Sequence, residues 1–244
     1  MTKLRLKFTK NGPIRFIGHL DLQRYFQKAI RRAEIDVKYS EGYSPHQVIS
    51  FAQPLSVGAT SDGEYMDMQV NSMVSPMDIM ERLNNVMNEG VTILDIVELP
   101  EGAPKAMTAV AAAEYLIEFR EGKEPALDYK TKLMEYMSQD KLPAIKKTKS
   151  GEKEIDMNPY IYDLSVMDDG KIHMLLSAGS VNNIKVSMVI ENFLKYFGEE
   201  VQEFALIVHR VDTYTEGTDD KGTFIEPFIC RDQAKRVYIN KTND

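Results

Sequence analysis

Two histidines in the first fifth of the chain are the residues best suited to acid–base chemistry. His19 lies just before a helical stretch in which Asp21 occupies the cap or first turn, and His46 ends the loop that begins at Ser40. Two imidazole rings within about 6–8 Å of one phosphate could act as general base and general acid in metal-independent RNA cleavage. The alternative is structural, with His19 capping the helix and His46 ordering the loop. The spacing of these residues leaves both interpretations open.

A set of basic residues in the same region could instead bind an anion. Four cations recur at steps of three and four, which places them on one face of a helix: Arg24, Lys28, Arg31 and Arg32. Arg5 and Arg15 lie nearby in sequence, and Tyr43 adds an aromatic ring that could stack on a base. We expect this group to contact the phosphates of RNA. A solvated helix face is the common alternative, although within the expected helix no acidic residue at i+4 relieves the like charges.

The distribution of charge along the chain also indicates an anionic partner. Residues 1–50 carry ten Lys/Arg and four Asp/Glu, whereas the remaining 194 residues carry 20 and 33. The formal charge is therefore +6 for the first segment and −13 for the rest, which add to the net charge of −7. An acidic protein that concentrates its positive charge in one N-terminal element favours RNA or an acidic protein surface as its partner.

Composition excludes several other classes of function. No apolar run approaches the ~18 residues needed to span a bilayer, and the first ten residues lack the apolar core of a signal peptide, so we expect a cytoplasmic protein with no membrane partner. The single cysteine, Cys230, excludes an internal disulfide and a cysteine-ligated zinc or iron–sulfur centre. The glycine-rich phosphate loops of nucleotide-binding enzymes are also missing. The sequence therefore predicts no metal and no cofactor, and it leaves open whether the protein is an enzyme.

Hydrophobic periodicity predicts the elements that would position these residues. In the first half it predicts strands at 4–10, 37–40, 46–52, 64–70 and 91–100, and helices at 20–33 and 75–90. In the second half it predicts strands at 113–119, 161–166, 171–179 and 204–216, and helices at 126–139 and 183–198. His173 and His209 fall in these strands and are interpreted as ordinary sheet residues, and residues 61–65 are interpreted as a turn entering a strand.

The order of these elements is typical of the ferredoxin-like arrangement, βαββαβ, in each half. We therefore predict an α+β protein made of two tandem ferredoxin-like units with antiparallel sheets. The first unit would span residues 1–102 and the second residues 110–244, with a join rich in Pro, Gly and Ala between them. A single continuous sheet through both halves is the competing arrangement.

The motifs of the first half resemble those of a known family. They are Arg15–Leu22, Ala29–Ala33, Tyr39–His46 and several short stretches between Ser50 and Tyr65. These motifs are similar to the radical-SAM-linked domain of uncharacterised bacterial proteins. The resemblance implies a radical-SAM protein as a partner, and because the chain has no CxxxCxxC motif it resembles the stand-alone companion of that enzyme. No activity is established for the family, so the resemblance assigns no catalytic role to any residue.

Three hypotheses about function follow. The first, which we favour, is a radical-SAM-associated accessory protein that binds RNA or tRNA through its basic helix. The second is a metal-independent RNA-processing or RNA-modifying enzyme, which requires His19 and His46 to share a cleft. The third is a module that docks its basic face on an acidic surface of a radical-SAM enzyme.

Overall fold

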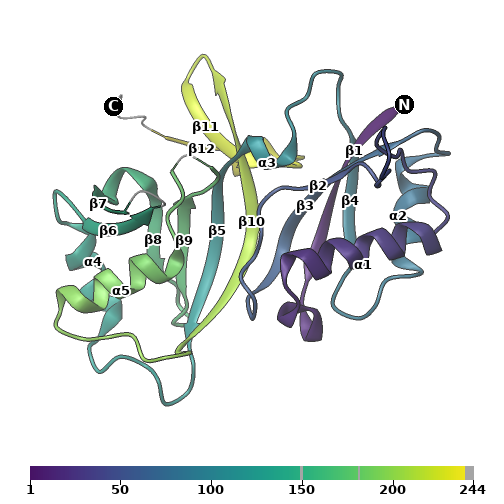
Figure 1. The fold of residues 1–244 in the computed structure, drawn as a ribbon. Coiled ribbons are helices and arrows are strands. Elements are labelled where there is room, and N and C mark those ends of the chain that lie inside the picture. The colour runs from purple at the N-terminus through teal and green to yellow at the C-terminus, as the bar shows by residue number, and fades with distance from the viewer. Residues whose placement is uncertain (149–150, 181, 240–244) are drawn as a thin grey trace.

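One broad β-sheet runs through the molecule (Figure 1). The computed structural model describes residues 1–148, 151–180 and 182–239. The first half of the chain forms, in order, β1 (Thr2–Lys10), η1 (Gly12–Phe16), α1 (His19–Arg32), β2 (Ile49–Phe51), β3 (Thr60–Val70), α2 (Pro76–Asn84) and β4 (Ile93–Glu98). The second half forms α3 (Ala106–Ala109), β5 (Val110–Phe119), α4 (Tyr129–Met137), β6 (Pro143–Thr148), β7 (Gly151–Asp156), η2 (Asn158–Tyr160), β8 (Ile161–Val166), β9 (Ile172–Ser177), α5 (Val186–Tyr196), β10 (Leu206–Asp219), β11 (Gly222–Pro227), η3 (Gln233–Lys235) and β12 (Val237–Tyr238).

The sheet is antiparallel except at its centre. Its strand order is β4-β1-β3-β10-β5-β9-β8, and β2 also pairs with β3, β11 with β10, and β12 with β11. The strands β3 and β10 run parallel to each other, with Thr60 opposite His209 and Ser61 opposite Arg210. The hairpin of β6 and β7 forms a separate two-stranded sheet. The central parallel contact therefore joins the two halves of the chain.

Alternating side chains of β1 separate a core face from a charged face. Leu4, Leu6 and Phe8 are fully buried in one cluster with α1, whose Phe26 meets Phe8 edge-on at a ring-centroid distance of 4.7 Å. A strand of period two and a helix with an apolar stripe bury their apolar sides against each other in this way. The intervening residues of β1, including Arg5, belong to the opposite face of the sheet.

The helix α5 covers the second half of the sheet in the same manner. Its apolar stripe consists of Val189, Ile190 and Phe193, which are fully buried in one cluster with Ile117 of β5 and Met174 of β9. Figure 1 shows α1 and α5 on the same side of the sheet. One hydrophobic core therefore lies under α1 and is built from the first half, and another lies under α5 and is built mostly from the second half.

A glycine allows the two halves to approach closely at the centre of the sheet. A Cβ atom at Gly63 would lie 2.3 Å from the Cα atom of Asp212, a distance that real Cβ atoms do not reach. The hydroxyl of Thr213 also donates a hydrogen bond of 2.8 Å to the carbonyl oxygen of Gly63. A side chain at position 63 would therefore push β3 and β10 apart.

The α+β class and the mostly antiparallel sheet are confirmed, with several differences in detail. Two separate sheets were expected, but β3 and β10 join the strands of both halves into one. The predicted strand 37–40 forms only isolated bridges at Val37 and Tyr39, and the predicted helix 75–90 ends at Asn84. The sequence did not indicate β6, β7, β11 or β12. Within the described ranges, none of the helices has the length and apolar character to cross a membrane.

Candidate anion-binding face of the first helix

The helix α1 presents a basic face to solvent and an apolar face to the core. Leu22, Phe26 and Ile30 are buried, whereas Lys28 and Arg31 on the other side are exposed. In the part of the chain that the structure describes, neither Lys28 nor Arg31 has a carboxylate partner. The third cation of the stripe, Arg24, lies 3.1 Å from Asp21, but both of these side chains are largely exposed, so the pair is weak and open to exchange.

Arg32 and Arg15 lie at the two ends of this basic face. Arg32 is exposed and donates a hydrogen bond of 3.0 Å to the carbonyl oxygen of Val86, which fixes its direction near the end of α1. Arg15 precedes α1, and its guanidinium lies 4.7 Å from the centre of the Phe16 ring, which is 62% exposed. A cation stacked on an exposed aromatic ring is a surface on which a nucleic acid base can stack.

The structure places Arg5 away from the basic face. Its guanidinium is buried and binds both carboxylate oxygens of Asp67, at 2.8 and 3.1 Å. A third hydrogen bond runs from Arg5 to the carbonyl oxygen of Pro104, and the guanidinium also lies 4.6 Å from the centre of the Phe228 ring. Arg5 therefore links β1 and β3 to the segment after β4, and it has no path to a partner bound on α1.

The loop from Ser40 to His46 is attached to the side of α1 and projects Tyr43 into solvent. The side chain of Gln47 donates a hydrogen bond of 3.2 Å to the carbonyl oxygen of Gln27 in α1. Within the loop, the backbone N–H of His46 donates to the Ser40 hydroxyl at 3.1 Å. The Tyr43 side chain is fully exposed. The loop thus holds an aromatic ring in solvent beside the helix that carries Lys28 and Arg31.

The two histidines have different partners along α1. The ring of His19 packs edge-on against Phe51 at 5.5 Å, whereas Nδ1 of His46 lies 2.9 Å from the Ser40 hydroxyl. The neighbour of His46, Gln47, is bound at Gln27, and from position 19 to position 27 a helix advances ~12 Å. The two rings therefore have different surroundings, with His19 against β2 and His46 inside its own loop. Among the described residues, no group of His, Cys, Asp and Glu is arranged to hold a metal ion.

A buried charged cluster at the junction of the two halves was not predicted from the sequence. Arg210 of β10 is only 3% exposed and donates to Glu64 of β3 at 2.8 Å and to the Tyr115 hydroxyl at 3.4 Å. Burial opposes the charge of Arg210, but Glu64 and Tyr115 raise its pKa above the ordinary value. Lys10 is 1% exposed, and burial lowers its pKa, with Glu64 acting in the opposite direction. This cluster positions the strands that support α1, but its groups are not accessible to a large partner.

A second cluster lies on the second half of the sheet, around His173. Its Nδ1 atom lies 2.6 Å from Asp163 and its Nε2 atom 2.8 Å from Glu114, which also accepts a hydrogen bond of 2.6 Å from the Tyr214 hydroxyl. Hydrogen bonds to Asp163 and Glu114 raise the pKa of His173 to about 9, so the ring is an imidazolium at neutral pH. An imidazolium between two carboxylates is a stabilising cross-strand contact, and it is unsuited to act as a general base.

These features describe an α+β protein with a basic face on α1. The chain belongs to the family described as an uncharacterized protein conserved in bacteria (DUF2344), whose model matches residues 3–186. No curated protein matches the chain.

Among solved structures, this chain matches one chain from a crystal structure of a Cbf5-Nop10-Gar1 complex, with 8% sequence identity and a TM-score of 0.48. The alignment covers 86% of this chain and 48% of that one, so this chain spans about half the length of its neighbour. Similarity at this level carries no argument about function.

Proposed function

We propose that this protein binds RNA through the exposed face of α1. The observation that carries the proposal is the pair Lys28 and Arg31, which are exposed on a helix whose other face is buried and which have no carboxylate partner among the described residues. Cations that project from a rigid helix are held near one another without a large cost in chain entropy. Phosphate contacts of this kind supply most of the affinity of RNA-binding proteins that lack base-specific contacts.

Exposed aromatic rings favour RNA over an acidic protein surface as the partner. Tyr43 is fully exposed on the loop beside α1, and Phe16 is 62% exposed under the guanidinium of Arg15. Proteins that bind single-stranded RNA combine a basic surface with aromatic side chains on which unpaired bases stack. The same rings would gain little from a partner that offers only carboxylates.

We also propose that the protein acts as the accessory of a radical-SAM protein in the bacterial cytoplasm. The resemblance in Arg15–Leu22 and Tyr39–His46 supports this proposal. In the structure these two motifs form the start of α1 and the loop attached to its side. The family motifs and the proposed RNA surface therefore occupy the same region of the molecule.

The strand orders support the further proposal that residues 1–102 and 110–244 are two ferredoxin-like units. In the first half β4, β1, β3 and β2 are neighbours in that order, and in the second half β10, β5, β9 and β8 are neighbours. Both orders correspond to 4-1-3-2 within the unit, which is the arrangement that βαββαβ units adopt. The two units would share one sheet through β3 and β10.

The enzyme hypothesis receives less support. It requires His19 and His46 to reach one phosphate, and each ring is bound to a different part of the region around α1. We therefore assign the basic face a binding function and give neither histidine a catalytic role.

Fluorescence anisotropy with labelled single-stranded RNA tests the proposal. Replacing Arg24, Lys28 and Arg31 by Gln removes three exposed cations, and we expect affinity at low salt to fall about tenfold or more. The matched control replaces Lys141, Lys153 and Lys221 by Gln, which removes the same charge from exposed positions of the second half. Equal affinities for wild type, variant and control would refute the proposal. Capture of a radical-SAM protein without RNA, lost in the same variant, would instead favour protein docking.

A further inference from the structure

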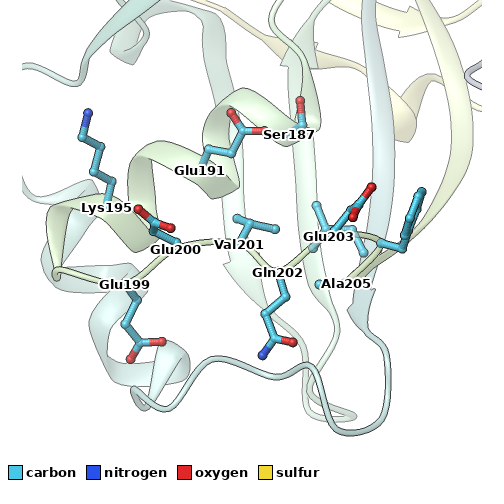
Figure 2. Close-up of a pocket in the computed structure, with 11 residues that line it drawn as sticks. Ser187, Glu191, Lys195, Glu199, Glu200, Val201, Gln202, Glu203 and Ala205 are labelled. Atoms are coloured by element: carbon cyan, nitrogen blue, oxygen red, sulfur yellow. The ribbon is translucent and has the colours of Figure 1, made fainter.

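An open acidic groove lies between α5 and the segment that leads into β10. The groove has a volume of about 580 Å³. One wall is the stripe Ser187, Glu191 and Lys195 of α5, and the other is the chain from 199 to 206 (Figure 2). Figure 2 shows the carboxylates of Glu191, Glu200 and Glu203 distributed around this groove.

The groove combines unpaired carboxylates with exposed apolar groups. Glu191, Glu200 and Glu203 are exposed and have no cationic partner for their carboxylates among the described side chains. The carboxylate of Glu199, in contrast, accepts two backbone hydrogen bonds from residues 126 and 127, at 3.0 and 2.8 Å. Phe204 is 75% exposed and lines the groove. Exposed apolar surface bordered by charge is typical of protein interaction sites.

The acidic groove and the basic face of α1 flank the centre of the sheet. Along the chain, α1 follows β1 and precedes β2, and β2 pairs with β3. The helix α5 directly precedes β10. Because β3 and β10 are neighbours, α1 and α5 are the inner helices of the two halves. Figure 1 shows both on the same side of the sheet. One face of the molecule therefore carries a basic helix on one side of its centre and an acidic groove on the other.

We propose that the acidic groove binds the basic face of α1 from a second copy of this chain, in a closed two-fold dimer. A rotation of 180° about an axis along the central strands places each α1 over the groove of the other copy. Both contacts then form at once, and the assembly closes instead of growing into a fibre. This inference stands independently of RNA binding, because it rests on the two surfaces alone.

Charge and apolar groups match across such a contact. Arg24, Lys28 and Arg31 would face the three unpaired glutamates, and complementary potentials of this kind favour the correct orientation of two surfaces. Leu20 is 66% exposed at the start of the basic face, and with Phe16 it supplies apolar surface for Phe204 of the second copy. The lengths also agree, since α1 of 14 residues extends ~21 Å and α5 of 11 residues ~16 Å.

The dimer would cover the face that we assign to RNA. RNA and the second copy would therefore compete for α1, and a saturating amount of single-stranded RNA should convert the dimer to an RNA-bound monomer. If RNA binding fails but the dimer forms, only the proposed function is lost.

Charge-reversal variants of the full chain test the dimer by sedimentation equilibrium and light scattering. One variant carries Glu191→Lys, Glu200→Lys and Glu203→Lys, and the other carries Arg24→Glu, Lys28→Glu and Arg31→Glu. Each variant alone places like charges in both contacts, so we expect its dimer dissociation constant to rise about tenfold or more. An equimolar mixture restores both contacts and should form a 1:1 heterodimer.

The control variant carries Glu89→Lys, Glu98→Lys and Glu101→Lys, three exposed positions of the first half, and it should dimerise like the wild type. Circular dichroism checks that each variant is folded. The single substitution Glu200→Lys replaces the groove variant if that one is not folded, and Lys28→Glu replaces the α1 variant. A wild-type protein that is monomeric at all concentrations overturns the proposal. A dimer that neither variant weakens, or a mixture that forms no heterodimer, overturns it as well.

Discussion

The loss of stability on replacing His173 by Gln should depend on pH, because only the wild-type ring carries a charge that titrates. His173 lies between Asp163 and Glu114 at 2.6 and 2.8 Å, and these hydrogen bonds raise its pKa from 6.5 to about 9. A raised folded-state pKa contributes stability that is fully present below the unfolded value near 6.5 and is lost as pH rises through about 9. Gln keeps hydrogen-bonding capacity but carries no charge at any pH.

The size of the effect follows from the same pKa difference. The interval from 6.5 to about 9 corresponds to at most about 3.5 kcal/mol, at about 1.4 kcal/mol per pH unit. The Asp163 side chain is 48% exposed, so solvent screening reduces the expected contribution to about 1–2 kcal/mol. The hydrogen bond to His173 lowers the pKa of Asp163. Burial opposes the charge of Glu114, but hydrogen bonds from His173 and Tyr214 together lower the pKa of its carboxyl. The contribution of these carboxylates is therefore lost in acid.

Urea unfolding of wild type and His173→Gln at about pH 6, 8 and 10 measures the difference directly. We expect the wild type to be more stable by about 1–2 kcal/mol at pH 6, with the gap closing as pH passes 9. An NMR titration of the His173 ring provides the pKa independently. A ring that titrates below pH 7, or a stability difference that does not change with pH, would refute the assignment of an imidazolium.

Three further predictions concern the junction of the two halves. Gly63→Ala should lower the free energy of unfolding by about 3 kcal/mol or more, because the added Cβ atom would lie 2.3 Å from the Cα atom of Asp212. Chemical denaturation measures this loss, and a loss below about 1 kcal/mol contradicts the prediction. Lys10→Met should leave stability unchanged or raise it, since the substitution removes a buried charge and leaves Arg210 balanced by Glu64. A loss of stability above about 2 kcal/mol in the same assay counts against this explanation. Glu64→Gln leaves two buried cations without their carboxylate and should cost about 3–5 kcal/mol, and a thermal midpoint equal to that of the wild type would show that the ion pair is not formed.

Local periodicity was sufficient to predict much of the first half. The apolar spacing of Leu22, Phe26 and Ile30 predicted α1 to within one residue at each end, because a helix is defined by contacts between near neighbours in sequence. The basic stripe on its exposed face followed from the same spacing. Local patterns did not indicate the hairpin of β6 and β7, whose sequence is dominated by charged residues and lacks an alternating apolar face.

Contacts between distant residues account for what the sequence could not show. The close approach of β3 and β10 depends on Gly63, which in sequence has only the appearance of a turn residue. Arg5 was grouped with the basic helix because it is close in sequence, but its partner Asp67 is 62 residues away. His173 looked like an ordinary strand residue, since its partner Glu114 is 59 residues distant. Such pairings carry no local signal, so they become visible only in the folded chain.

The salt dependence of RNA affinity tests the central claim most directly. For single-stranded RNA, each phosphate that a cation neutralises contributes about −0.7 to the slope of log K against log salt concentration. If Arg24, Lys28 and Arg31 each contact one phosphate, the slope of the Gln variant should be smaller in magnitude by about 2 than that of the wild type. The control at Lys141, Lys153 and Lys221 should keep the wild-type slope. Identical slopes for the wild type and the α1 variant would contradict the assignment of the RNA surface to this helix.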